Sequence, residues 1–270
     1  MILDLDIGNT LSKWRLKSLE QDKIIERGSV WTRDRWDGSQ ELPDFRDLKA
    51  IRISNVAGKD ILRKVERLAK RYRVKLYVAR SCEESAGVRN GYQRPEALGV
   101  DRWMGVLAGY HALGGCCVID CGSAITMDFV LPDGQHLGGF ITPGMRLMKE
   151  SLKLGTSNVP FQQDDTYQGL TVPGTSTQEA VTHGIFLAAV GQIALAYDQF
   201  CQSQKQKLPI ILTGGDADLI RRGLSANAYR WPDMVYAGLE LIFPLTALER
   251  QGQLYGAPVR AKIIEKVVFA

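Results

Sequence analysis

A short motif occurs twice in this chain, and the repeat constrains the fold more than any other feature of the sequence. Leu5-Asp6-Ile7-Gly8-Asn9-Thr10 and Ile119-Asp120-Cys121-Gly122-Ser123-Ala124 share the pattern apolar-Asp-x-Gly-polar-small. Each copy ends an apolar run typical of a buried strand and leads into a second run. The two copies are a domain's length apart, which is typical of an internal duplication. The sequence therefore predicts two related halves, residues 1–114 and 115–270, that meet at Gly114-Gly115.

Hydrophobic spacing in both halves predicts an α/β fold. In the first half we expect a hairpin of strands 2–7 and 12–18, strands at 23–32, 50–55 and 74–78, and helices at 59–72 and 98–113. In the second half we expect strands at 116–119, 124–131, 138–142, 209–213 and 234–236, and helices at 145–153, 178–202 and 239–251.

Composition narrows the class of protein. The chain has 34 Lys and Arg against 30 Asp and Glu, a mild net charge of +4 that would help to attract a polyanion such as a nucleotide. No stripe of basic and aromatic residues indicates a nucleic-acid partner. The start MILDLDIGNT lacks the features of a signal peptide, and no uninterrupted apolar stretch of membrane-spanning length occurs, so no membrane partner is expected. Five cysteines without zinc spacing fit a reducing compartment, and we expect a cytoplasmic protein.

The repeated turn has the chemistry of a phosphate site. Gly8 permits close backbone approach, and successive N–H groups in such a turn can hold an anion. A carboxylate at Asp6 would repel phosphate unless a cation lay between them, which indicates Mg²⁺. A plain hairpin turn would explain one copy alone. Two copies, together with a third Gly-rich loop at Thr213-Gly214-Gly215-Asp216, favour a nucleotide site, and no Walker or Rossmann motif is present.

These loops resemble those of the actin, sugar-kinase and chaperone-ATPase superfamily, in which two ribonuclease-H-like halves bind ATP in the cleft between them. A more specific element, Gly91-Tyr92-x-x-Pro95-x-x-Leu98-Gly99-x-Asp101-Arg102, resembles type III pantothenate kinases, the Bvg accessory factor family. Gly138-Gly139-x-Ile141-x-Pro143-Gly144 adds to this resemblance, which covers nearly the whole chain. The resemblance implies duplicated halves with a nucleotide cleft between them.

The Asp101-Arg102 pair suits phosphoryl transfer to a hydroxyl. Such a reaction commonly uses a carboxylate that accepts the hydroxyl proton, and an arginine can hold a substrate carboxylate by a bidentate fork. A helix start also offers free N–H groups to an anion. Without the resemblance, a helix-start charge and a surface cation would explain the same two residues.

The resemblance implies ATP-dependent phosphorylation of pantothenate to 4′-phosphopantothenate, the first step of coenzyme A biosynthesis. It implies that Asp101 is the catalytic base and that pantothenate contacts Tyr92, Gly99, Val100, Asp101, Arg102 and Thr177, although Thr175 or Ser176 could replace Thr177. It implies that ATP lies on Asp6, Ile7, Gly8, Asn9, Thr10, Leu11, Ser12, Lys13 and Ser123. Mg²⁺ would lie near Asp6 through the phosphates, and K⁺ or NH₄⁺ at Asp120. The resemblance also implies a homodimer.

Two other functions stay open at this point. One is a different small-molecule kinase of the superfamily, such as a sugar kinase, which would need a polyol-binding set of Asp, Asn and Glu. The other is a nucleotide-binding regulatory protein that has lost catalysis, against which Asp6, Asp101 and Asp120 argue. His111, His136 and His183 are isolated and receive no role, and the five tryptophans, Trp31 among them, are expected to be packing residues.

Overall fold

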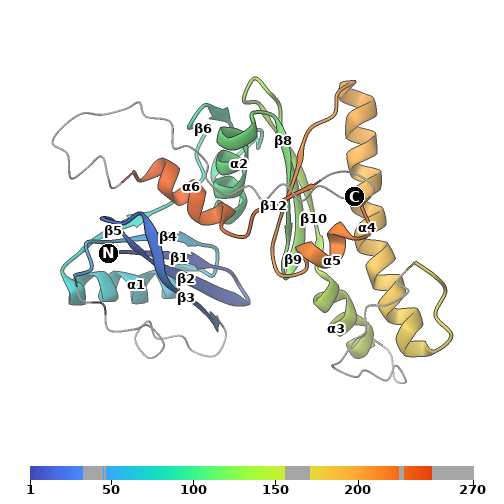
Figure 1. Ribbon diagram of the computed structural model, residues 1–270, viewed down its shortest axis with the longest axis horizontal. Coiled ribbons are helices and arrows are strands. Elements are labelled where there is room, and N and C mark those ends of the chain that lie inside the picture. The colour runs from blue at the N-terminus through green and yellow to red at the C-terminus, as the bar shows by residue number, and fades with distance from the viewer. Residues whose placement is uncertain (33–44, 46, 156–170, 225–227, 245–270) are drawn as a thin grey trace. The chain divides into compact units, whose positions relative to one another are not determined.

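The chain forms two compact units (Figure 1). The computed structural model describes residues 1–32, 45, 47–155, 171–224 and 228–244. Unit 1 comprises Met1–Ala112, Gly134–His136 and the residues from Asp233 onward as far as 244, and unit 2 comprises Leu113–Asp133 and Leu137–Pro232. The expected division of the domains after Gly114 stays a prediction.

Unit 1 is built on a five-stranded mixed sheet of order β3-β2-β1-β4-β5. Its strands are β1 (Ile2–Ile7), β2 (Leu11–Ser18), β3 (Lys23–Trp31), β4 (Ala50–Asn55) and β5 (Lys75–Val78). β1 pairs antiparallel with β2 and parallel with β4, and Ile7 opposes Ser12 where the hairpin turns. The hairpin predicted from alternation is therefore confirmed.

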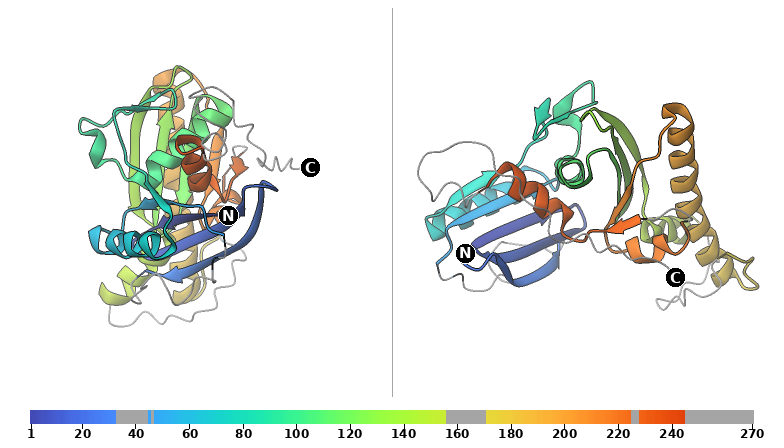
Figure 2. Two further views of the ribbon diagram at one scale, coloured as in Figure 1. Left: turned by 90° about the vertical axis from the view of Figure 1, so that its left-hand side faces the viewer. Right: turned by 45° about the horizontal axis from the view of Figure 1, so that its top comes forward.

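The two faces of this sheet have different partners (Figure 2). Leu3, Leu5 and Ile7 share one face of β1 and pack in the core with helix α1 (Lys59–Tyr72). Asp4 and Asp6 lie on the opposite face, where helix α6 (Met234–Ile242) packs against β1 and β4. The same face thus holds α6 and the carboxylate of the first repeated motif.

Helix α2 (Val100–Leu113) follows these strands, and all but its last residue belongs to unit 1. Unit 1 also includes the short strands β6 (Glu84–Ser85) and β7 (Val88–Arg89) and the 3₁₀ helix η1 (Pro95–Ala97). Eight consecutive residues of α2, from Arg102 to Gly109, are buried. A helix buried all round holds its first turn rigidly, and that turn contains Asp101 and Arg102.

Unit 2 repeats the sheet of unit 1 in the order β10-β9-β8-β11-β12. Its strands are β8 (Cys116–Cys121), β9 (Ala124–Val130), β10 (His136–Pro143), β11 (Ile210–Thr213) and β12 (Ala228–Arg230), and its helices are α3 (Met145–Gly155), α4 (Thr177–Gln204) and α5 (Ala217–Arg221). β8 pairs antiparallel with β9 and parallel with β11, as β1 does with β2 and β4. The predicted α/β fold with two duplicated ribonuclease-H-like halves is confirmed.

Helix α4 is the main helix of the core of unit 2. By length and composition it is apolar enough to cross a membrane. Its buried residues, Ile185, Phe186, Ala189 and Ile193 among them, share one core with Cys117, Ile119 and Cys121 of β8. A helix that packs against a sheet reaches the same hydropathy without a membrane. Cys116, Cys117 and Cys121 are all buried in β8, where a free cysteine behaves as a small hydrophobe.

Two sequence-based predictions were wrong. Residues 234–236 are the start of helix α6, not a strand, and the last strand is β12 at Ala228–Arg230. α6 is buried on more than one side, since a Cβ at Gly238 would fall 2.3 Å from the carbonyl oxygen of Met104, and this hides the helical period. Residues 245–251 of the expected last helix lie outside the described residues. Trp31, expected to pack inside, ends edge strand β3 and is 53% exposed.

Candidate active site

The first repeated loop joins β1 to β2 in unit 1. Asp6 lies near the end of β1, opposite Lys13 of β2 and Ser54 of β4. The turn is closed by the Gly8 N–H group, which donates to the carbonyl oxygen of Leu11 at 3.1 Å. This places a carboxylate, a lysine and a glycine turn at the carboxyl end of the central strand.

Thr32 fixes the shape of this loop. Its N–H group donates to the Thr10 carbonyl at 2.9 Å, and its hydroxyl donates to the Gly8 carbonyl at 2.8 Å. The same hydroxyl lies 2.9 Å from the Ser12 hydroxyl. Among the described residues, the N–H groups of Asn9 and Thr10 donate no hydrogen bond. They are therefore available to an anion, as the sequence suggested.

The second repeated loop joins β8 to β9 in unit 2 with the same register. Asp120 opposes Thr126 of β9 and Thr213 of β11, and the Gly122 N–H group donates to the Ala124 carbonyl at 3.0 Å. Ser123 lies exposed in this turn. Asp120 and Ser123 thus occupy positions in unit 2 that correspond to Asp6 and the turn residues of unit 1.

A Gly-rich loop after β11 lies against the second repeated loop. Gly214 has φ +92°, and a Cβ there would fall 2.4 Å from the Cys121 oxygen and 2.5 Å from Asp120 Oδ1. Only glycine fits a backbone that passes so close with positive φ. The Asp216 N–H group donates to the Cys121 carbonyl at 3.0 Å, and burial raises the pKa of the Asp216 carboxyl. The third motif of the sequence therefore packs directly on the second.

The candidate ligand atoms at this loop are oxygens, the Asp120 carboxylate and the Cys121 carbonyl. Oxygen ligands of this kind suit K⁺, NH₄⁺ and Mg²⁺. Within the described ranges, no group of three or more His, Cys, Asp or Glu side chains could hold a metal ion. A single carboxylate beside a phosphate loop suits a cation that takes its other ligands from phosphate and water. The residues present therefore fit a cation bound together with a nucleotide.

Five of the six predicted substrate residues lie in unit 1, and the sixth, Thr177, lies in unit 2. Arg102 Nη1 donates to the Tyr92 hydroxyl at 2.7 Å, and its guanidinium carbon lies 5.6 Å from the centre of the Tyr92 ring. Asp101 Oδ1 accepts from the Arg102 N–H group at 2.8 Å. A Cβ at Gly99 would come within 2.7 Å of that oxygen, so the carboxylate needs glycine there. Val100 begins α2 and completes the group.

Asn90, which sequence reasoning missed, supports the loop that carries Tyr92. Its Oδ1 accepts from the Tyr92 N–H group at 3.0 Å, and its Nδ2 donates to the Cys82 carbonyl at 3.1 Å. The Ser81 hydroxyl donates to the Leu98 carbonyl at 2.8 Å and ties the other end of the loop. Asn90 precedes Gly91, and such an Asn-Gly pair is a known turn signal that could have identified it.

His136 is the second residue that sequence reasoning missed. It is fully buried, and its Nδ1 accepts from the Gly91 N–H group at 3.3 Å. Its ring stacks on Tyr92 with centres 6.2 Å apart and an interplanar angle of 13°. Since 45 residues separate His136 from Gly91, no local pattern could have joined them.

Thr177 is the first residue of α4 in unit 2, and it is exposed. The two residues before it, Thr175 and Ser176, cap the start of the helix together with Glu179. The Ser176 hydroxyl accepts from the Glu179 N–H group, and Thr175 donates to Glu179 Oε2 from both its N–H and hydroxyl groups. These bonds lower the pKa of Glu179. Among the described residues, the Thr177 hydroxyl has no partner, so of the three it is the one left for a ligand.

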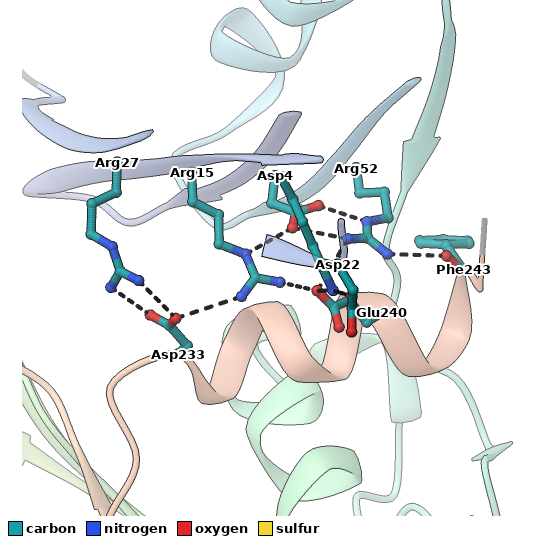
Figure 3. A network of polar contacts seen from close by, with 9 residues as sticks. Asp4, Arg15, Asp22, Arg27, Arg52, Asp233, Glu240 and Phe243 are labelled. Atoms are coloured by element: carbon teal, nitrogen blue, oxygen red, sulfur yellow. Dashed lines mark hydrogen bonds and ion pairs between the residues drawn. The ribbon is translucent and has the colours of Figure 1, made fainter. Parts of the chain in front are cut away.

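A buried ion-pair network lies two residues before Asp6 on the same face of β1 (Figure 3). Asp4 is fully buried, and Arg52 binds it through Nε at 2.6 Å and Nη2 at 2.9 Å. Arg15 donates to it through Nε at 2.9 Å and also donates to Glu240 of α6. Asp233 at the start of α6 pairs with Arg27 at 3.2 Å. The network joins four strands, β1 to β4, to helix α6.

Solved structures share this fold at low sequence identity. A Baf family protein from Campylobacter jejuni, described as a transcriptional activator, matches with a TM-score of 0.59 and 21% identity, covering 91% of this chain and 99% of that one. A Listeria monocytogenes protein described as an N-acetylmannosamine kinase matches with a TM-score of 0.50 and 11% identity, over 93% of this chain and 99% of that one. These likenesses support the α/β fold with two related sheets.

Sequence comparison gives the family. The family description "type III pantothenate kinase" matches residues 2–199. A protein of that name from Chromohalobacter salexigens is 56% identical over 99% of this chain and 96% of its own length. Another from Pseudomonas aeruginosa is 38% identical over 91% of this chain and its own full length. The resemblance seen in the sequence is confirmed, and this chain belongs to the type III pantothenate kinase family.

Proposed function

We propose that this protein transfers the γ-phosphoryl group of ATP to the primary hydroxyl of pantothenate, giving ADP and 4′-phosphopantothenate, the first step of coenzyme A biosynthesis. The observation that carries the proposal is the cluster at the start of α2, where the Asp101 carboxylate accepts from the Arg102 main-chain N–H group and the Arg102 guanidinium donates to the Tyr92 hydroxyl. Pantothenate has a hydroxyl at one end and a carboxylate at the other. The cluster offers a complementary group for each end.

Asp101 is the proposed base. Phosphoryl transfer depends mostly on positioning and electrostatics, and an Asp commonly accepts the proton of the attacking hydroxyl. Asp101 is partly exposed, and the Arg102 N–H group holds one of its oxygens. That bond fixes the orientation of the carboxylate, and its other oxygen is the one proposed to accept the proton of the hydroxyl.

Arg102 is the proposed anchor of the substrate carboxylate, with Tyr92, Gly99 and Val100 beside it. Its guanidinium is nearly buried and held by the Tyr92 hydroxyl, so a charge-assisted bond there would be poorly screened by solvent. Thr177 is the proposed additional contact, since Thr175 and Ser176 are engaged in capping α4. A flexible substrate held at one end presents its hydroxyl at a defined place.

The repeated loops are the proposed nucleotide site. Residues Asp6 to Lys13 and Ser123 would hold ATP, with the N–H groups of Asn9 and Thr10 facing its phosphates. Asp6 would hold Mg²⁺ through the phosphates, and Asp120 would hold K⁺ or NH₄⁺. When bound, these ions would offset the charge of the phosphates.

We also propose a cytoplasmic homodimer. One strip of α4 is apolar and exposed: Leu187 is 47% exposed and Leu195 60%, with Ala180, Gly184, Ala188 and Gly191 along the same strip. Small residues between leucines allow a second helix to approach closely. A second copy of the chain is the proposed partner of this strip.

ATP turnover that depends on pantothenate tests the proposal. Asp101→Asn should lower kcat by about 10²- to 10⁴-fold, as loss of a general base does, and leave ATP affinity nearly unchanged. Near-normal kcat in the variant would contradict the role of Asp101. Wild-type protein that binds ATP without pantothenate-dependent turnover would favour a regulatory protein, and turnover with a sugar instead would favour the other kinase.

A further inference from the structure

His136 belongs to unit 1 through a short segment, Gly134–His136, that lies between two stretches of unit 2. The segment is held from several sides. The Arg89 N–H group donates to the Gly134 carbonyl at 2.9 Å, and Arg89 Nε donates to Gln135 Oε1 at 3.2 Å. Gln135 Nε2 donates to the carbonyl of His136 at 2.9 Å. The main chain that carries the imidazole is therefore fixed.

The imidazole contacts two consecutive residues of the substrate loop in two ways. Nδ1 accepts from the Gly91 N–H group, so Nδ1 carries no proton in this arrangement. The ring also stacks nearly parallel on Tyr92. It contacts the ring of Trp103 of α2 as well, with ring centres 6.3 Å apart and the two planes tilted by 58°. The hydrogen bond to Gly91 fixes the main chain just before Tyr92, and the stack fixes the orientation of the Tyr92 ring.

The tilt of that ring matters because of what lies at its far end. The Tyr92 hydroxyl accepts from Arg102 Nη1 at 2.7 Å, and the guanidinium lies beside the ring. His136, Tyr92 and Arg102 thus form a series of direct contacts that ends at the proposed carboxylate anchor. A shift of the ring would move the hydroxyl and, with it, the guanidinium.

We propose that His136 is a positioning residue of the substrate site, acting through Gly91 and Tyr92 to set the place of the Arg102 guanidinium. This inference rests on the proposed role of Arg102 in binding pantothenate. Loss of His136 should weaken pantothenate binding and leave ATP binding and the chemical step largely intact. We assign His136 a positioning role because it binds the Gly91 N–H group and stacks on Tyr92, the residue that holds Arg102.

Two substitutions separate the two contacts of His136. His136→Phe keeps an aromatic ring to stack on Tyr92 but removes the acceptor. His136→Asn removes the ring but keeps an acceptor, since Asn Oδ1 occupies nearly the position of His Nδ1. We expect His136→Phe to raise KM for pantothenate about 5- to 100-fold, the effect of leaving the Gly91 N–H group unpaired, with kcat and the KM for ATP within about twofold of wild type. We expect His136→Asn to recover most of that loss.

A double-mutant cycle with Tyr92→Leu tests the route of the effect. If His136 acts through Tyr92, the loss caused by His136→Phe should be much smaller in the Tyr92→Leu background. Losses that multiply independently would overturn the proposal, as would an unchanged KM for pantothenate in His136→Phe, or equal changes for pantothenate and ATP. Should His136→Phe fail to fold, the cycle runs with His136→Leu, which removes both the ring and the acceptor, and the thermal midpoint of that variant is the control. A wild-type protein without pantothenate-dependent turnover would instead reject the proposed function, before any variant is compared.

Discussion

Arg102 is only 8% exposed, and its surroundings hold it in place from two directions. Its Nη1 donates to Tyr92, and its main-chain N–H group donates to Asp101. A charged group so placed has lost most of its hydration, and a bond from it to a carboxylate contributes about 1.5–3 kcal/mol. The proposed base and the proposed anchor are neighbours in sequence and joined by a hydrogen bond, so a change at one of them also affects the position of the other.

Arg102→Ala should reduce kcat/KM for pantothenate far more than for a pantothenamide, whose amide replaces the carboxylate. Arg102→Lys should fall between the wild type and the alanine variant, because lysine keeps the charge but loses the fork. The measurement is kcat/KM for both substrates in all three proteins. Equal losses for the acid and the amide would show that the substrate carboxylate is held elsewhere.

Asp120 Oδ1 lies so close to the Gly-rich loop after β11 that a Cβ at Gly214 would fall 2.5 Å from it. We expect activity with K⁺ or NH₄⁺ and little activity with Na⁺ as the sole monovalent cation. Asp120→Ala should remove the benefit of K⁺ together with most of the activity. Initial rates across a K⁺ titration check this, and full wild-type activity in sodium buffer would contradict it.

At the scale of elements, the network around Asp4 gives α6 its place on the sheet of unit 1 (Figure 3). Burial alone would lower the pKa of Arg15, but the carboxylates of Asp4 and Glu240 outweigh burial, and the pKa lies above its ordinary value. The guanidinium also lies 4.6 Å from the centre of the Tyr236 ring. Arg52 donates to the Phe243 carbonyl at the end of α6, so both ends of the helix are bound.

Asp4→Asn should destabilise the protein by about 3–5 kcal/mol, because it leaves two buried guanidinium groups without their shared carboxylate. The matched control is Asp60→Asn, the same change in an exposed pair with Arg63, which should leave the unfolding midpoint almost unchanged. Urea unfolding followed by circular dichroism measures both. Equal midpoints for the two variants would mean that the network contributes little to stability.

Local patterns predicted most elements because most carry a one-sided apolar face. Alternation in Ile2–Ile7 and the helical spacing of Ile61, Val65 and Leu68 identified β1 and α1 at their observed bounds. α6 was misread because it is buried on more than one side, which hides the helical period of its apolar residues. The same limit applies to the site: Asp101 and Arg102 lie in a continuous motif, whereas His136 reaches Gly91 only through the fold. Buried charges such as Asp4 are likewise explained by partners distant in the chain.

At the scale of the whole molecule, the exposed strip of α4 predicts self-association. Leu195→Asp should convert a dimer into a monomer, since it places a charge in an apolar contact. Leu154→Asp is the control, because Leu154 is 89% exposed on α3 and lies outside the strip. Sedimentation equilibrium of the three proteins gives the result. A wild-type monomer, or a Leu195→Asp dimer, would contradict the proposed interface.

The chain returns to unit 1 twice after leaving it, at Gly134–His136 and again from Asp233. A gene cut after codon 114 would therefore yield a fragment without Glu240, which pairs with Arg15, and without His136. The two sheets are similar, but unit 1 cannot be produced from one continuous piece of the chain. A split-protein reporter built from this enzyme would report only when both fragments are supplied together, and a circular permutant would need its new ends in a loop that leaves these returning segments intact.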